Sequence, residues 1–368
     1  MALALYRKYR PKSLADILGQ EHVVEVLKNA ARQDKLAHAY LFYGPRGTGK
    51  TTMARLLAKI ANCETRQKDK KFKEKGEPCN TCGPCTEIDA GRGIDVVEID
   101  AASNRGIDEI RSLKEGIRLA PSSYKYKVFI LDEVHMLSKD AFNALLKTLE
   151  EPPAHAILIL ATTEYDKVPA TITSRTQRYH FKKLSIVQMV EKLQTVVKSE
   201  KLKVTTDALE FIAALGEGSL RDSESLLDQM ASLTDNIDLP AVEKNIGRVG
   251  FSRTADLADT ILKNDLKKAL TGIAELNELG YNVVDLNKEL IQYLRRVITL
   301  KFSPDLESEF KKELTAKELE QVKAHAKIAD SVKTIPLLRS LIRAYSEMRY
   351  SPFASIPLEV AIIENLNP

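Results

Sequence analysis

Short apolar runs alternate with amphipathic stretches in the first half of the chain. The apolar runs predict strands, and apolar residues spaced by three or four positions predict helices. The predicted strands are 39–43, 95–100, 126–131 and 156–161, and the main predicted helices are 23–32, 51–60 and 138–151. Strands that alternate with helices predict a parallel sheet, with any ligand at the carboxyl ends of the strands.

The pattern becomes entirely helical from Leu184 onward. Amphipathic helices are predicted over 186–199, 206–215, 255–263, 284–300, 316–329, 334–350 and 357–365. Gly216–Asp222 interrupts this series, and Ser219 is suited to cap the helix that follows. The apolar stripes of the last third are expected to form the core of a helical bundle, and some are expected to face a partner.

Composition limits the class of protein. A length of 368 residues predicts two or three domains, and 29% charged with 44% hydrophobic residues is typical of a soluble globular protein. No apolar run approaches the roughly 20 residues that span a bilayer, and the N-terminus lacks the apolar core of a secretion signal. We therefore expect a cytoplasmic protein, and the net charge of +4 permits nucleic-acid binding without requiring it.

A glycine-rich loop follows the first predicted strand. Its residues are Gly44, Pro45, Arg46, Gly47, Thr48, Gly49, Lys50 and Thr51, and Thr52 continues into the helix. Strand, glycine loop and helix form the context of a phosphate-binding loop, in which backbone N–H groups and the helix N-terminus face an anion. Lys50 is expected to reach the β- and γ-phosphates of a nucleotide, and the Thr51 hydroxyl to hold Mg²⁺.

Polar side chains end two further predicted strands. Asp132 and Glu133 follow 126–131, where Asp132 is suited to order Mg²⁺ and Glu133 to polarise an attacking water. Thr162 and Thr163 follow 156–161, and a hydroxyl there either senses a γ-phosphate or simply caps the strand.

Two arginines have both a functional and an ordinary explanation. Arg175 lies in the stretch 172–178, where it either clamps a phosphate or is a surface arginine. Arg221 begins a helix after the break at 216–218, where it either acts as a phosphate sensor on a lid or is a surface charge.

All four cysteines lie close together in the sequence. Cys63 is followed by Cys79, Cys82 and Cys85, which form two overlapping C-x-x-C units. Four thiolates suit a tetrahedral structural Zn²⁺, and the alternatives are a redox pair or four unrelated thiols. The intervening stretch 64–78 is very polar and rich in lysine, and is predicted to be an exposed, mobile loop.

Two basic segments are candidates for contacts with nucleotides or nucleic acid. The segment Tyr6–Pro11 either stacks on a base or lies along the domain surface. Arg105, Arg111 and Lys114 give the segment after the second strand a basic side, which is either a solvated face or a set of phosphate contacts.

Together these motifs resemble the gamma/tau subunits of the bacterial DNA polymerase III clamp loader, within the AAA+ ATPases. The matching stretches occur in family order along the first two thirds of the chain. They are 6–11, 19–22, the phosphate loop, the four cysteines, 99–103, 132–137, 149–153, 161–163, 174–175 and 218–222, with 356–360 near the end.

The resemblance implies a fold and a set of partners. The fold is a RecA-like α/β AAA+ core with a parallel sheet over 1–180, carrying a zinc module at 63–85, then an all-α lid over 181–243 and an all-α collar over 244–368. It implies ATP, Mg²⁺ and Zn²⁺ as cofactors. The implied partners are the delta and delta-prime subunits and further gamma/tau copies in a pentameric ring, the sliding clamp and primer–template DNA. The implied location is a bacterial cytoplasm, at the nucleoid.

It also implies roles by position. Asp132 and Glu133 are the Walker B pair, Thr163 is sensor 1, and Arg221 is sensor 2. Arg175 resembles an arginine finger that enters the site of a neighbouring subunit. The adenine pocket is implied to include Tyr6, Arg7, Pro11 and Val23, and Arg105, Arg111 and Lys114 to follow the DNA.

Two departures from the family pattern stand out. Thr176 occupies the position that is usually cysteine after Ser174 and Arg175, and the spacing from Cys63 to Cys79 is longer than usual. A flexible insert lengthens at small entropic cost, so zinc is still expected. A tau-type C-terminal extension is absent, so we expect a gamma-like or truncated form.

Other functions are weighed against an ATP-driven clamp loader motor. A structural or adaptor subunit with a vestigial nucleotide site is disfavoured by the intact Lys50, Thr51, Asp132 and Glu133. Another AAA+ activity, such as a helicase loader or a Holliday-junction motor, is disfavoured by the cysteine module. No motif indicates nucleotidyl transfer.

Overall fold

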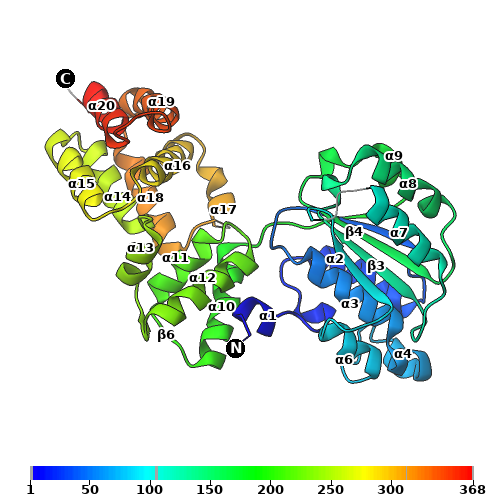
Figure 1. Cartoon of the computed structure of the whole chain (residues 1–368). Helices are drawn as coiled ribbons and strands as arrows, with labels where there is room; N and C mark the ends of the chain where they lie inside the picture. The colour runs from blue at the N-terminus through cyan, green and yellow to red at the C-terminus, as the bar shows by residue number, and fades with distance from the viewer. Residues whose placement is uncertain (1–2, 104–106, 312, 367–368) are drawn as a thin grey trace. The chain divides into compact units, whose positions relative to one another are not determined.

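The computed structural model describes residues 3–103, 107–311 and 313–366, which form two compact units (Figure 1). Unit 1 comprises Met1–Leu184 and Glu217–Asp222, and unit 2 comprises Ser185–Gly216 and Ser223–Pro368. Each unit has its own hydrophobic core, and each is described separately below.

Unit 1 is built on a five-stranded parallel sheet in the order β2-β3-β4-β1-β5. Its strands are β1 (Ala39–Tyr43), β2 (Val96–Asp100), β3 (Lys127–Asp132), β4 (Ala156–Thr162) and β5 (Gln177–His180). The central strand β4 is buried along its whole length, as expected for a strand that is covered on both faces. The predicted α/β class with a parallel sheet is confirmed.

Helices cover both faces of this sheet (Figure 1). Alternate side chains of one strand enter different cores: Tyr40 and Phe42 of β1 pack with one group of helices, and Leu41 packs with the other. The first group is α2 (Glu21–Arg32), α3 (Lys50–Asn62) and α6 (Gly83–Asp89), and the second is α7 (Ile107–Arg118), α8 (Lys139–Glu150) and α9 (Ala170–Thr173). Further short elements of unit 1 include α1 (Leu5–Lys8), η1 (Leu14–Asp16), η2 (Val134–Met136) and η3 (Tyr165–Lys167).

The register of the sheet places the predicted functional residues together at the carboxyl ends of the strands. Asp100 pairs with Asp132 across β2 and β3, and Tyr43 pairs with Thr162 across β1 and β4. Because all five strands are parallel, the residues that follow β1, β3 and β4 emerge together at their carboxyl ends.

In unit 1, the strand β5 and the stretch 64–78 differ from the sequence prediction. The fifth strand, β5, was not predicted, because Gln177–His180 is polar and mostly exposed at the sheet edge and has no apolar run. The prediction that 64–78 is an exposed loop is wrong, because it contains α4 (Glu64–Lys68) and α5 (Lys70–Lys73). Asp69 caps α5, and Arg66 is buried, with its guanidinium donating to the carbonyls of Ile60 and Ala31.

The described residues of unit 2 are helical apart from one pair of two-residue strands, so the prediction of an entirely helical second half is nearly correct. Its first part contains α10 (Ile186–Glu200), α11 (Thr206–Leu215), α12 (Leu220–Leu233, which begins in unit 1) and α13 (Leu239–Ile246), with β6 (Lys203–Val204) and β7 (Asn236–Ile237) pairing in parallel. Its second part contains α14 (Phe251–Leu262), α15 (Leu266–Glu278), α16 (Val283–Phe302), η4 (Pro304–Leu306), α17 (Glu307–Phe310), α18 (Ala316–Ile328), α19 (Ser331–Met348) and α20 (Ser355–Leu366).

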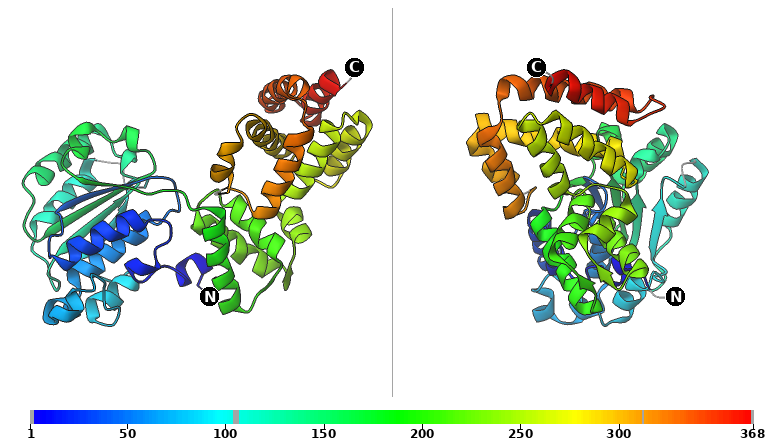
Figure 2. Two further views of the ribbon diagram at one scale, coloured as in Figure 1. Left: turned by 180° about the vertical axis from the view of Figure 1, so that it is seen from behind. Right: turned by 90° about the vertical axis from the view of Figure 1, so that its left-hand side faces the viewer.

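The long helix α16 is central to the second part of unit 2. It packs against α14, α18 and α19, and α19 lies beside α20 in both orientations of the molecule (Figure 2). The shared core includes Leu290, Leu294 and Val297 of α16. Across the described part of the chain, no helix combines the length and the apolar character needed to span a membrane.

Candidate functional site

The phosphate-binding loop is formed by the turn between β1 and α3. Gly44 and Gly47 both have positive φ, at +142° and +72°, where side chains are rarely tolerated. A Cβ at Gly44 would lie 2.1 Å from the Phe181 carbonyl oxygen, and one at Gly47 would lie 1.8 Å from Oγ of Ser219. The sequence therefore needs glycine at both positions for backbone shape and for close packing.

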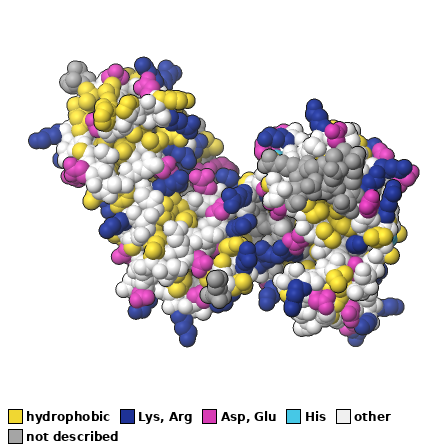
Figure 3. Space-filling view, in the orientation of Figure 1, with side chains coloured by type: hydrophobic (Ala, Val, Ile, Leu, Met, Phe, Trp, Pro, Cys, Tyr) yellow, Lys and Arg dark blue, Asp and Glu magenta, His cyan; other side chains and the backbone are white. Residues whose placement is uncertain are grey.

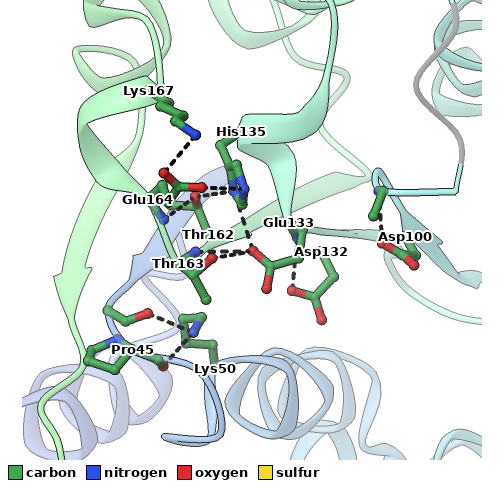
Figure 4. A network of polar contacts seen from close by, with 12 residues as sticks. Pro45, Lys50, Asp100, Asp132, Glu133, His135, Thr162, Thr163, Glu164 and Lys167 are labelled. Carbon is green, nitrogen blue, oxygen red and sulfur yellow. Dashed lines mark hydrogen bonds and ion pairs between the residues drawn. The ribbon is translucent and has the colours of Figure 1, made fainter. Parts of the chain in front are cut away.

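Lys50 lies in the first turn of α3 with its side chain buried. Its Nζ donates to the carbonyl oxygens of Gly44 and Pro45, each at 2.8 Å, so the ammonium closes the loop upon itself (Figure 4). Burial lowers the pKa of Lys50, and the carboxylates of Glu133 and Asp132 oppose this shift. An anion in the loop would add a further counter-charge to this buried cation.

Thr51 and Asp132 meet across the end of the sheet. Thr51 Oγ1 donates to Oδ2 of Asp132 at 2.6 Å, which joins α3 to the end of β3. A hydroxyl beside a carboxylate is a pair of hard oxygen ligands of the kind that Mg²⁺ binds. The donor set at this point therefore fits the expected metal.

Glu133 follows Asp132 in the left-handed region, with φ +48° and ψ +44°. Its Oε2 accepts hydrogen bonds from both the backbone N–H and Oγ1 of Thr163, at 3.2 and 2.8 Å. The structure thus brings the residue that follows β4 directly onto the carboxylate of the residue that follows β3.

A histidine without a predicted role lies beside Glu133 and Thr162. His135, in η2, places Nδ1 3.0 Å from Thr162 Oγ1 and 3.3 Å from Glu133 Oε2, and places Nε2 3.2 Å from Glu164 Oε1 (Figure 4). Lys167 pairs with the other oxygen of Glu164 at 2.7 Å. The available sequence signal was position: His135 comes soon after Asp132–Glu133, and Glu164 directly follows Thr163.

Arg221 contacts the N-terminal segment within unit 1. Its guanidinium carbon lies 4.9 Å from the centre of the Tyr6 ring, a cation–π arrangement. Arg7 Nε donates to Tyr6 Oη at 3.1 Å, and this bond, followed by the charges of Arg7 and Arg221, lowers the pKa of Tyr6. Two residues predicted in the adenine pocket and the predicted sensor arginine are thus neighbours.

Arg175 lies just beyond the end of α9. It forms an ion pair with Glu150 at 2.7 Å and donates to the Thr171 carbonyl oxygen at 2.8 Å and to Ser174 Oγ at 3.3 Å. The side chain keeps 35% of its surface exposed. These partners lie in α8, in α9 and at Ser174 directly after α9, so the guanidinium is held at the surface by its own unit.

The other predicted nucleotide contacts have mixed surroundings. Val23 is buried in the hydrophobic core under α2, and Pro11 and Thr52 are half-buried. Thr48 Oγ1 donates to the Pro45 carbonyl oxygen at 2.9 Å, whereas Arg46 is exposed. Of the predicted DNA contacts, Lys114 lies in α7 and is half-buried, Arg105 lies outside the described residues, and the Arg111 side chain is likewise not described.

The four cysteines form one cluster in three dimensions. The sulfur atoms of Cys63, Cys79, Cys82 and Cys85 all lie within 4.8 Å of one another. Backbone N–H groups point at two of them: Cys79 N lies 3.4 Å from Cys63 Sγ, and Thr81 N and Cys82 N lie 3.4 and 3.3 Å from Cys79 Sγ. Such donors stabilise thiolates, and four thiolates at this spacing fit a tetrahedral Zn²⁺.

Comparisons with protein-family models assign three consecutive regions of the chain. Residues 19–185 match the family described as DNA polymerase III, delta subunit. Residues 188–236 match the DNA polymerase III clamp loader subunit, ATPase lid domain, and residues 237–366 match DNA polymerase III subunits gamma and tau domain III.

Curated relatives agree with these matches. The chain is 42% identical to DNA polymerase III subunit tau of Bacillus subtilis, over 98% of this chain and 62% of that protein. It is 33% identical to DNA polymerase III subunit gamma of Buchnera aphidicola subsp. Acyrthosiphon pisum, over 98% of this chain and 97% of that protein. The chain spans 42% to 62% of the length of the first three curated relatives that it matches.

Among solved structures, the Thermotoga maritima RuvB Holliday junction branch migration motor is similar to this chain. The match covers 69% of this chain and 79% of the RuvB chain. The TM-score is 0.48 and the identity is 18%, so this likeness carries no argument about function.

Proposed function

Because the chain belongs to the family of gamma and tau subunits of DNA polymerase III, we propose that it is an ATP-driven motor subunit of the clamp loader. In this proposal, ATP hydrolysis drives the loading of a sliding clamp onto primer–template DNA, in the bacterial cytoplasm at the nucleoid. The observation that carries the proposal is that five residues meet at the carboxyl ends of the strands. They are Lys50, Thr51, Asp132, Glu133 and Thr163. A purely structural subunit would have no need to keep this set.

The proposed roles follow from the chemistry of each side chain. Lys50 would exchange its two carbonyl partners for β- and γ-phosphate oxygens, because a buried ammonium gains more from an anion than from neutral acceptors. Thr51 and Asp132 would hold Mg²⁺, which neutralises phosphate charge when it is bound. Glu133 would polarise the attacking water, and Thr163 would set the direction of that carboxylate.

We further propose that Arg175 acts in trans as an arginine finger and Arg221 in cis as a sensor. Arg175 is held at the surface by Glu150 and Thr171, which suits a group that enters a neighbouring subunit's site. Arg221 lies against Tyr6, so a nucleotide base that enters beside Tyr6, Arg7, Pro11 and Val23 would also meet the sensor. Arg105, Arg111 and Lys114 remain the proposed DNA contacts.

The proposed domain plan is an ATPase core over 1–180, a lid over 181–243 and a collar over 244–368. The collar would assemble the ring with delta, delta-prime and further gamma/tau copies. Support comes from exposed apolar side chains at the C-terminal end of unit 2, including Val332, Tyr350 and Phe353, which are 80%, 89% and 68% exposed. Figure 3 shows hydrophobic side chains gathered over this end. The cysteine cluster would hold a structural Zn²⁺.

Steady-state ATP turnover of the complex that contains this chain tests the proposal. We expect turnover to rise when clamp and primed DNA are added together, and Glu133→Gln to lower kcat by about 10²–10⁴-fold with ATP binding retained. An assembled complex whose turnover does not depend on Lys50 or Glu133 would show that this chain is a structural subunit.

A further inference from the structure

The His135 ring lies between two carboxylates. Its Nδ1 is 3.3 Å from Oε2 of Glu133, its Nε2 is 3.2 Å from Oε1 of Glu164, and its side chain is only 6% exposed (Figure 4). Carboxylate oxygens only accept hydrogen bonds, so a ring N–H that faces either carboxylate is the donor. Thr162 Oγ1 lies 3.0 Å from Nδ1 and accepts from the Glu164 backbone N–H, so the tip of β4 contacts the ring from a third direction.

The contacts of Glu133 are concentrated on one of its two oxygens. Oε2 lies within reach of three groups, the N–H and Oγ1 of Thr163 and Nδ1 of His135. None of the described residues is bonded to Oε1. Figure 4 shows this second oxygen pointing away from Thr163 and His135, toward the side where Asp132 and Lys50 lie.

The backbone of β3 does not by itself fix this direction. Glu133 has φ +48°, in the left-handed region that non-glycine residues adopt only at an energetic cost. The carboxylate therefore emerges at a bend between β3 and η2, and its orientation depends on what holds Oε2. Thr163 holds it from β4, and His135 holds it from η2, the element that follows the bend.

We propose that His135 is a positioning residue for Glu133: it fixes Oε2 so that Oε1 faces the phosphate loop. A general base contributes only when it lies within hydrogen-bond reach of the proton it takes. A carboxylate that rotates freely about its last bonds would spend part of its time misdirected. His135 removes this freedom without touching the nucleotide itself.

Glu164 contacts the His135 ring at Nε2, and Lys167 contacts Glu164. Lys167 holds Oε2 of Glu164 at 2.7 Å, and this contact lowers the pKa of Glu164 and keeps the carboxylate ionised. Glu164 thereby anchors Nε2 and stops the imidazole from tilting away from Glu133. The chain of contacts runs from Lys167 through Glu164 and His135 to Glu133.

The two ring nitrogens can be tested separately. The amide nitrogen of asparagine lies close to the position of Nδ1, and that of glutamine lies close to the position of Nε2. In the assembled complex with clamp and primed DNA, we expect His135→Ala and His135→Gln to lower kcat about 10- to 100-fold. KM for ATP should change by less than about twofold, since His135 does not reach the nucleotide. His135→Asn, which keeps a donor for Oε2, should recover most of the wild-type kcat.

A matched control is available at the other end of β4. His155 precedes the strand, and its Nε2 contacts the Ile117 carbonyl oxygen at 3.1 Å, so His155→Ala also removes one partly buried imidazole contact. We expect its kcat to stay within about twofold of wild type. Equal losses in His135→Asn and His135→Gln, or a wild-type kcat in His135→Ala, would overturn the inference.

This inference rests on the proposed ATPase function, and the two can fail separately. If the wild-type complex shows no ATP turnover, the proposed function is wrong. If the wild type turns over ATP and His135→Ala equals it, only the positioning role is wrong.

Discussion

The Thr51 hydroxyl donates to the Asp132 carboxylate across 2.6 Å, although the two residues are 81 positions apart in the chain. The contact joins the first turn of α3 to the end of β3. These are the two elements that a Mg²⁺ ion would have to bridge in order to orient phosphates over the loop.

Removing the Thr51 hydroxyl should weaken Mg²⁺ binding at the phosphate loop. We expect Thr51→Val, which keeps the shape of the side chain, to raise the Mg²⁺ concentration needed for half-maximal turnover at least tenfold, because a ligand oxygen is lost. Thr51→Ser retains the oxygen and should stay close to wild type. A Mg²⁺ titration of ATP turnover measures both variants, and identical curves for Val and Ser would exclude Thr51 as a ligand.

Loss of the Arg175 guanidinium should separate ATP binding from hydrolysis. An arginine finger typically contributes about 10³–10⁵ in rate. In complexes carrying Arg175→Ala we therefore expect DNA-stimulated turnover to fall by at least about 10³, with binding of a fluorescent ATP analogue unchanged. Arg175→Lys should not restore turnover, since lysine lacks the planar fork.

Glu150→Gln provides the control for Arg175, because it removes only the exposed ion pair at 2.7 Å. Exposed pairs of this kind contribute about 0.2–1 kcal/mol, so turnover should change little. A complex with Arg175→Ala that hydrolyses ATP normally would rule out the assignment in trans.

The cysteine cluster should hold about one zinc ion per chain. Cys82→Ser removes one of four thiolates and should abolish stoichiometric zinc, as measured by metal analysis and by a chromogenic chelator. Thr81→Ala is the matched control, since it removes only a hydroxyl contact to Cys79 Sγ at 3.5 Å, and should keep the metal. A metal-free wild type that loses two hydrogens on mild oxidation would instead identify a redox pair.

A buried carboxyl in α12 should make the stability of unit 2 depend on pH. Glu224 is 4% exposed, and no described residue bonds its Oε1. Burial raises its pKa to about 7, against a weaker opposing effect of Lys192. The folded state therefore binds this proton more tightly than the unfolded state does, and stability falls as pH rises from about 4.5 to 7.

The corresponding variant is Glu224→Gln, which resembles the protonated carboxyl. A shift of this size corresponds to about 3 kcal/mol, so the variant should be more stable than wild type by up to that amount at pH 8 and by little at pH 4.5. Urea unfolding at both pH values gives the comparison. Glu191→Gln, at an exposed position in α10, should show no such difference.

The regions that the sequence predicted well have strong local signals. Glycines at 44 and 47, the apolar runs of β1, β3 and β4, and the capped helix α8 are all explained by backbone freedom, burial or capping that a short window contains. The strand β5 and the helices α4 and α5 were missed because polar, exposed residues take their structure from neighbours. The Arg66 side chain shows why: its bonds to Ala31 and Ile60 tie a lysine-rich segment onto α2 and α3.

By itself, the sequence determined the phosphate loop, the carboxylates at 132 and 133, the four cysteines and the family, because each depends on residue type at fixed spacing. Only the tertiary structure decided which of these residues meet. The parallel register of β3 and β4 brings Thr163 onto one oxygen of Glu133, and packing within unit 1 places Arg221 over Tyr6. Such contacts join residues far apart in the chain, and their geometry depends on the packing of whole elements, which no local pattern records.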